Sequence, residues 1–163
     1  MSKKLFVNSQ TYNPMFMVSE EGVSEYQILT QGIYVGKIAK VRYDPVRALF
    51  IVVFTLADGD THSEFYHMTK KNGEMANYGI RALANLLKAA YQIDAIDRFD
   101  VDAVKGSVGR YVIFEIVHED YNNRLYDRID PFSYAPADDY EAVVYVEDDV
   151  AEESDEAETS AEA

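Results

Sequence analysis

The sequence predicts a mainly β protein: a five-stranded barrel with one helix between its third and fourth strands, followed by an acidic tail. Three observations support this fold class. Segments rich in β-branched and aromatic residues recur between turn signals. A single helical periodicity follows the third of these segments, and acidic residues gather at the C-terminus. Of the 163 residues, 48% are hydrophobic and 13% aromatic, which suffices for one domain with a substantial core.

Glycine and turn-forming residues divide the chain into these strands. Gly36 lies inside the first strand and, with a switch in apolar parity, indicates a bulge or a sharp bend. Asp44-Pro45 marks the first turn. Asp58-Gly59 predicts a hairpin, because glycine supplies the positive φ of a tight turn. A turn at 120–123 joins the last two strands, and Pro131 ends the second of them. The expected strands are residues 33–43, 48–56, 61–68, 110–118 and 124–129.

One helix is expected at about residues 74–91. Its buried face is given by the i, i+3, i+4, i+7 spacing of Leu83, Leu86, Leu87 and Ala90. Polar side chains fall together on the opposite face, namely Arg81, Asn85 and Lys88, and Gly79 weakens the first half. Three strands, a helix and a hairpin are the element order of an OB-fold, a five-stranded Greek-key barrel. A generic α+β domain can share this order.

The net charge of −14 is concentrated at one end of the chain. Residues 138–163 hold 12 acidic residues and no Lys or Arg, which leaves 17 acidic residues against 15 basic ones, a net charge of −2, for residues 1–137. A terminal block of like charge is typical of a disordered interaction tail, although a tail that only aids solubility would look the same. We therefore expect an N-terminal extension at 1–31, an OB-fold nucleic-acid-binding domain at 32–136 and a disordered acidic tail at 137–163.

Sequence patterns for catalysis are absent, so we expect no enzyme, no cofactor and no metal site. The chain has no Cys, which excludes disulfides and thiolate ligands. His62 and His67 would point to opposite faces of a strand, so they are expected to be solvated histidines rather than ligands of one metal. The aspartates at 94, 97, 100 and 102 do not have calcium-loop spacing. No P-loop, GxGxxG or GxSxG pattern occurs.

Binding features are more prominent, because basic residues and aromatic residues alternate on the expected strands. Single-strand binders need this combination: cations follow the phosphates, and flat rings stack on unpaired bases. The last strand is expected to place Arg124, Tyr126 and Arg128 on one face. The predicted nucleic-acid-binding residues are Tyr34, Lys37, Lys40, Arg42, Arg47, Phe50, Phe54, Tyr66, Arg110, Tyr111, Tyr121, Arg124, Tyr126 and Arg128.

Two of these features have alternative interpretations. Phe50 and Phe54 share one face of the second strand, and they are either exposed for stacking or covered by the helix or the N-terminal segment. Lys105-Gly106-Ser107-Val108-Gly109-Arg110 offers backbone amides between two cations, which could meet a phosphate, or it is a plain turn before a strand. A KH-type loop would need a second helix after it, and here a strand follows.

Three stretches resemble the small single-stranded-DNA-binding proteins of phage replication and recombination modules: residues 32–38, 80–87 and 105–124, within a region of resemblance at about 32–134. This resemblance implies an OB-fold that coats exposed DNA strands and an acidic tail that recruits replication or recombination proteins. The well-known tails end in an aromatic residue, whereas this chain ends Ser160-Ala161-Glu162-Ala163. The expected docking residues are therefore Tyr140, Tyr145, Glu147, Asp148 and Asp149.

No signal peptide is recognisable, and the longest apolar run, residues 48–54, is far shorter than a membrane helix. We expect a cytoplasmic protein (in the host cytoplasm if it is phage-encoded) with single-stranded DNA as its partner and no membrane partner. Self-association into a homo-oligomer stays open. The main alternative function is a protein–protein adaptor or DNA-mimic inhibitor of a host factor. A nuclease with an unrecognised site and a structural virion protein are further alternatives.

Overall fold

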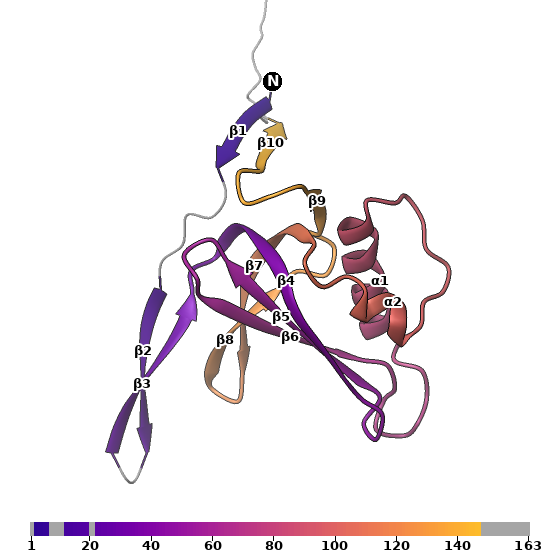
Figure 1. Cartoon of the computed structure of the whole chain (residues 1–163). Coiled ribbons are helices and arrows are strands. Elements are labelled where there is room, and N and C mark those ends of the chain that lie inside the picture. Colours follow the sequence, from indigo (N-terminus) through magenta and orange to yellow (C-terminus); the bar gives the residue numbers. More distant parts are fainter. Residues whose placement is uncertain (1, 7–11, 20–21, 148–163) are drawn as a thin grey trace, which may run out of the picture.

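A computed structural model describes residues 2–6, 12–19 and 22–147, with side chains described for residues 28–142 (Figure 1). Strands dominate, which confirms the mainly β prediction. The strands are β1 (Ser2–Phe6), β2 (Tyr12–Ser19), β3 (Gly22–Leu29), β4 (Gly32–Asp44), β5 (Leu49–Leu56), β6 (Thr61–His67), β7 (Tyr111–Tyr121), β8 (Arg124–Ile129), β9 (Ala135–Ala137) and β10 (Val143–Glu147). The helices are α1 (Asn77–Tyr91) and α2 (Val101–Lys105).

The main sheet is antiparallel and has the strand order β6-β5-β4-β7-β8, with β9 added beside β7. The long strand β4 lies at its centre and pairs with both β5 and β7. The edge strands β6 and β8 share no ladder, so the sheet is open between them. The five strands and the helix expected at 33–129 occur in that order as β4 to β8 and α1, with bounds that differ from the prediction by at most three residues.

Strand β4 is irregular, as Gly36 predicts, but the register shift lies slightly further along. Pairing with β5 slips between Ile38 and Lys40, so Ala39 is an extra residue. Gly36 itself serves a packing role, because a Cβ there would lie 2.6 Å from a ring carbon of Phe114. The glycine lets the Phe114 ring lie against the β4 backbone.

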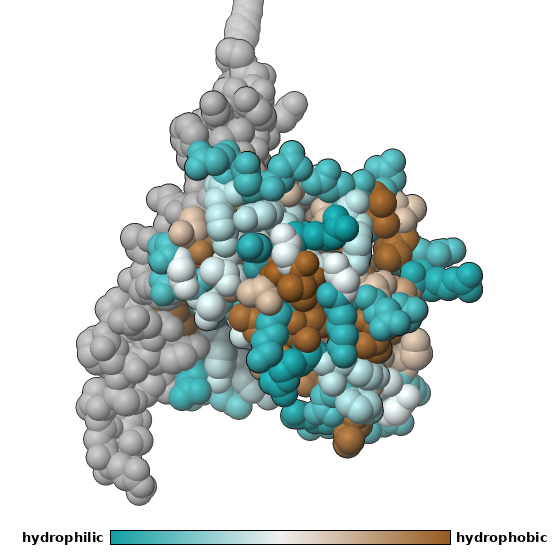
Figure 2. Space-filling view, viewed as in Figure 1, coloured by the Kyte–Doolittle hydropathy of each residue, from teal (hydrophilic) through white to brown (hydrophobic). Residues whose placement is uncertain are grey.

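The core lies between the inner face of the sheet and α1, which packs on one side of it together with α2 (Figure 1). The apolar spacing on α1 is confirmed, since Leu83, Leu86, Leu87 and Ala90 are buried. From the sheet, alternate residues of β5 point inward: Phe50, Val52, Phe54 and Leu56. On the outside, apolar residues reach the surface in the middle of the view in Figure 2, with polar residues around them.

Several elements were not predicted from the sequence. The N-terminal extension contains the β2–β3 hairpin, and its end is joined to the domain because the Leu29 N–H donates to the Asp127 carboxylate (2.8 Å). Helix α2 is preceded by the N-cap residue Asp100, whose side chain accepts the Ala103 N–H (2.9 Å). Strand β10 pairs with β1, so a paired strand occurs at residues 143–147, within the segment expected to be a disordered tail. None of the described helices is long and apolar enough to cross a membrane.

Candidate nucleic-acid interface

The irregularity in β4 brings three cations to the outer face of the sheet. Lys37 pairs with Thr55 before the register shift, whereas Lys40 and Arg42 pair with Val53 and Ile51 after it. Directly paired residues share a face of the sheet. Because of the one extra residue in β4, the odd-numbered Lys37 and the even-numbered Lys40 and Arg42 therefore lie on the same face. The β5 residues beside them point away from the core, because their neighbours in sequence are the buried ones.

Strand β6 completes this surface. Phe65 pairs with Ile51 and is 51% exposed, and Ser63 pairs with Val53. We call this surface the sheet face and define it by Lys37, Lys40, Arg42, Ile51, Val53 and Phe65. No carboxylate of the described residues lies within ion-pair distance of its three cations. The Lys37 ammonium lies over the Tyr111 ring, 5.7 Å from its centre. The sheet face therefore combines positive charge that no carboxylate neutralises with an exposed ring and partly buried aliphatic side chains.

A second surface, the hairpin face, lies on the outer side of β7 and β8 and consists of Tyr121, Arg124, Tyr126 and Arg128. Tyr121 pairs with Arg124 next to a two-residue turn, where Asn122 and Asn123 both have positive φ (54° and 61°). The Arg124 guanidinium lies 5.7 Å from the centre of the Tyr126 ring. The alternation of cation and ring expected on β8 thus does lie on one face, with Ile129 buried on the other.

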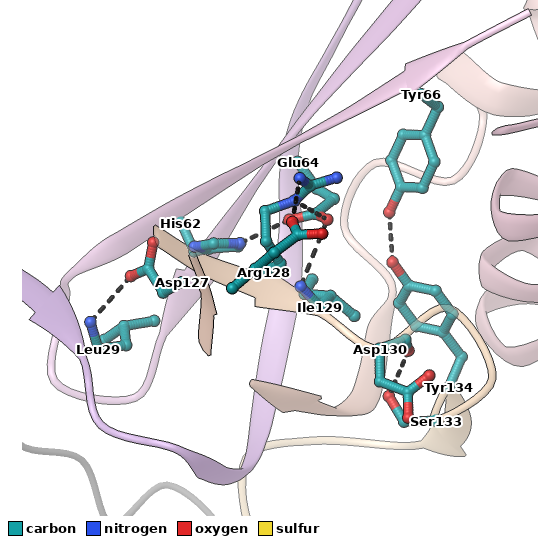
Figure 3. Close-up of polar contacts among 11 residues, drawn as sticks. Leu29, His62, Glu64, Tyr66, Asp127, Arg128, Ile129, Asp130, Ser133 and Tyr134 are labelled. Atoms are coloured by element: carbon teal, nitrogen blue, oxygen red, sulfur yellow. Dashed lines mark hydrogen bonds and ion pairs between the residues drawn. The ribbon is translucent and has the colours of Figure 1, made fainter. Parts of the chain in front are cut away.

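Between β6 and β8, side-chain contacts replace a ladder; we call this region the seam (Figure 3). The buried Glu64 carboxylate on β6 accepts the Ile129 N–H on β8 (3.3 Å) and contacts Arg128 Nε (3.4 Å) and His62 Nε2 (2.8 Å). Arg128 also pairs with Glu119 (2.9 Å). Arg128 is therefore held by two carboxylates and is less available to a phosphate than the sheet-face cations.

Two tyrosine hydroxyls meet deeper in the seam, where Tyr66 of β6 forms a hydrogen bond with Tyr134 (Figure 3). Burial raises the pKa of both phenols well above the usual value, and for Tyr134 the nearby Glu64 carboxylate adds to the rise. Both phenols are therefore protonated at neutral pH.

Four of the predicted binding rings belong to the core, which corrects the sequence prediction. Tyr34, Phe50, Phe54 and Tyr66 are each at most 3% exposed and contact the buried cluster beneath α1. The alternative in which the helix covers Phe50 and Phe54 is the correct one. These four rings cannot stack on a base while the core is intact.

The remaining predicted residues lie apart from the two faces or are already engaged. Arg47 pairs with Asp44 in the β4–β5 turn (2.8 Å), and its hydrogen bonds lower the pKa of that carboxyl. The Arg110 guanidinium stacks on Tyr91 (4.4 Å). Tyr111 packs edge-on against Tyr140 (4.9 Å).

The loop at 106–109 is a plain turn. Every amide from Gly106 to Arg110 donates to a backbone carbonyl: Gly106 to Asp102, Ser107 to Val104, Val108 to Lys105, Gly109 to Ile38 and Arg110 to Ser107. No amide of this loop is left to bind a phosphate, so the phosphate-binding interpretation is wrong.

The expected docking residues of the tail fall into three groups by their position in the chain. The Tyr140 hydroxyl donates to the Thr55 carbonyl (2.7 Å), and its ring packs on the outer face of β7, so it is part of the domain. Tyr145 and Glu147 lie on β10, where the structure describes only the strand. Asp148 and Asp149 lie outside the described residues.

The histidine prediction needs one correction. His62 is buried with Glu64 rather than solvated, whereas His67 is exposed as expected. Within residues 28–142, no three His, Asp or Glu side chains gather in a way that could hold a metal ion.

The predicted binding residues do not include Phe65, Ile51 or Val53, which the structure places on the sheet face. The signal that would find them is the combination of strand register and the β4 irregularity, because together these decide which parity faces outward. Neither a protein-family model nor a curated protein matches the chain.

Proposed function

We propose that this protein binds single-stranded DNA without sequence specificity and that the sheet face is its primary contact surface. The observation that carries the proposal is that one extra residue in β4 places Lys37, Lys40 and Arg42 on the same face of the sheet as the exposed Phe65. Cations at strand spacing follow a phosphate backbone, and an exposed ring accepts an unpaired base by stacking.

The hairpin face supplies further contacts of the same kind. Tyr121 is 66% exposed beside the β7–β8 turn, and Arg124 and Tyr126 follow it on the same side. It adjoins the sheet face across the seam, because Arg128 and Phe65 line one pocket there. A strand of DNA crossing β5 and β6 would meet these side chains next.

The fold supports this proposal without deciding it. The strand order β6-β5-β4-β7-β8, with a helix between β6 and β7, is that of an OB-fold opened between its third and fifth strands. We propose that the protein is an OB-fold in which the seam contacts of Glu64 close the barrel. In that fold the ligand surface lies over the second and third strands, which are β5 and β6.

The near-neutral charge of residues 1–137 limits the electrostatic part of the affinity. Stacking and apolar contact must supply much of the binding free energy, about 1–3 kcal/mol per stacked base. In its cellular role, the protein would coat exposed strands during phage DNA replication or recombination, and its acidic C-terminus would recruit partner proteins.

The test is fluorescence anisotropy of a labelled oligo-dT strand, with a matched duplex as a control, at low and moderate salt. We expect binding to the single strand, weak binding to the duplex, and a loss of affinity of about tenfold for Phe65→Ala. The matched control is Arg98→Gln against Arg42→Gln, since Arg98 is an exposed cation outside both faces.

Equal affinity of Arg98→Gln and Arg42→Gln would argue that the sheet face is not the binding surface. Failure of the wild-type chain to bind any single strand would overturn the proposal. A protein–protein adaptor would then be the favoured function.

A further inference from the structure

Exposed aromatic side chains gather beside α1 and the connection from β8 to β9. Tyr78 on the first turn of α1 is 65% exposed, and Phe132 in the connection is 71% exposed. Most large apolar residues between positions 28 and 142 are buried. Exposed rings concentrated in one area are typical of a binding surface.

These rings border a series of hollows. The first is a pocket of about 280 Å³ at the seam, which we call the seam pocket; Phe65, Tyr66, Tyr78, Arg128 and Tyr134 are among its lining residues. A second hollow shares Tyr78 and continues to Arg81 and Phe132. A third shares Phe132 and reaches Asn85 and Lys88. Together the second and third hollows form the α1 groove, defined by Tyr78, Arg81, Asn85, Lys88, Pro131 and Phe132.

Cations outnumber acidic residues along this path, although the seam pocket is also lined by the Glu64 carboxylate, which pairs with Arg128. Lys70 lines the seam pocket, Arg81 and Lys88 line the α1 groove, and no carboxylate of the described residues lies within ion-pair distance of any of them. Asp94 is the acidic residue in the lining of the third hollow. The Asn85 amide donates to the Pro131 carbonyl (2.9 Å), which fixes the two walls of the groove relative to each other.

The seam pocket also contains a hydroxyl proton without a partner. The hydrogen bond between Tyr66 and Tyr134 uses one of their two O–H protons, and within residues 28–142 no other acceptor is bonded to either oxygen. Tyr66 is 2% exposed and lines the pocket. A buried donor without an acceptor is costly, and the carbonyl oxygen of a nucleobase would satisfy it.

We propose that the seam pocket and the α1 groove form a second segment of the single-stranded-DNA path. One nucleobase enters the seam pocket and accepts the free tyrosine proton, and the following nucleotides stack on Tyr78 and Phe132 with their phosphates near Arg81 and Lys88. This inference rests on the proposed function. Phe65 connects the segments because it belongs to both the sheet face and the seam pocket.

The size of the pocket agrees with an occupant smaller than a typical drug molecule, such as one nucleobase. Pockets that hold drug-sized ligands measure about 300–1,000 Å³, and the seam pocket is slightly below this range. The continuation along α1 implies a longer binding site than the sheet face alone provides, within the about 4–16 nucleotides that one OB-fold can cover.

The experiment compares labelled oligo-dT strands of about 5 and about 12 nucleotides, lengths near the two ends of the OB-fold range. In the full chain, the double substitution Tyr78→Ala/Phe132→Ala should weaken binding of the longer strand by about tenfold or more and leave the shorter strand unaffected. Both side chains are exposed, so the fold should be retained. The matched control is Val108→Ala, which truncates an exposed apolar residue on the α2–β7 loop.

The outcomes separate the two proposals. Binding of the short strand with no selective loss on the long strand would overturn the second segment and leave the sheet face standing. No binding of either strand by the wild-type chain would overturn the proposed function itself. For the pocket, Tyr66→Phe/Tyr134→Phe should also weaken only the longer strand, and unchanged affinity would overturn base insertion.

Discussion

The Glu64 carboxylate on β6 accepts the backbone N–H of Ile129 on β8, and in this way a side chain bridges the two strands that no ladder joins. The same carboxylate contacts His62 and Arg128. One buried acidic group therefore holds together the edges of the sheet and positions Arg128 beside the seam pocket.

Glu64→Ala should destabilise the fold by about 3 kcal/mol, because it leaves two buried groups, the His62 ring and the Ile129 N–H, without their partner. The measurement is urea denaturation followed by circular dichroism. Glu119→Gln is the matched control: it removes the other carboxylate on Arg128, which is exposed, and should cost less than about 1 kcal/mol. Equal costs would show that Glu64 does not hold the seam.

Gly79→Ala should destabilise the protein, although Ala is the better helix former by about 1 kcal/mol. A Cβ at Gly79 would lie 2.0 Å from the His67 carbonyl oxygen, so α1 would have to move away from β6. Thermal unfolding gives the sign directly. A higher melting temperature for the variant would contradict the close approach of α1 and β6.

The Gly79 case illustrates which features could be predicted from the sequence. Local patterns predict β4 to β8 and α1, because the turn residues and the apolar spacing that define each element lie within it or next to it in the sequence. From the sequence alone, Gly79 is a residue that weakens the helix. The reason for a glycine there is the close approach of the His67 carbonyl, which belongs to another element and is not visible in the local sequence. The burial of Phe50 and Phe54 was equally undecided, because it depends on which side of β5 receives α1.

The residues of the proposed binding surface illustrate the same limit: their types can be recognised in the sequence, but their arrangement in space cannot. The cations on β4 and the alternation on β8 were visible as residue types, yet their common face depends on the extra residue Ala39 and on cross-strand register. That Phe65 shares a face with Arg42 follows only from the pairing of both residues with Ile51. The seam required tertiary information throughout, since Glu64 and Ile129 are 65 residues apart.

The salt dependence of DNA binding should identify which cations contact phosphates. Each phosphate contact to a single strand contributes about 0.7 to the slope of log affinity against log salt concentration. Lys40→Gln/Arg42→Gln should therefore reduce this slope by about 1.4. Arg98→Gln provides the reference and should retain the wild-type slope, and an unchanged slope in the double variant would exclude phosphate contacts at these positions.

Alkaline pH should weaken the fold through Tyr66 and Tyr134. Their pKa values are raised well above 10.0 in the folded protein, so the folded state keeps protons that the unfolded chain releases. Their contribution is complete below the unfolded pKa and is lost as pH rises above it, by up to about 1.4 kcal/mol per pH unit for each group. Tyr66→Phe/Tyr134→Phe should lose less stability than wild type between about pH 9 and about pH 11. The comparison is made by urea denaturation at the two ends of this pH range.

Two C-terminal truncations should change different properties: the shorter one should raise the affinity for DNA, and the longer one should also lower the stability of the fold. Removing residues 148–163 takes away eight acidic residues, which on our proposal would compete with DNA for the same cations, so affinity for single strands should rise, most clearly at low salt. Removing residues 138–163 also deletes Tyr140, whose hydroxyl bonds to Thr55 and whose ring packs on Tyr111. That loss should cost about 1–2 kcal/mol of stability. Anisotropy and urea denaturation of both truncated chains test the pair of effects. A fall in DNA affinity for the shorter truncation would mean that residues 148–163 assist binding rather than oppose it.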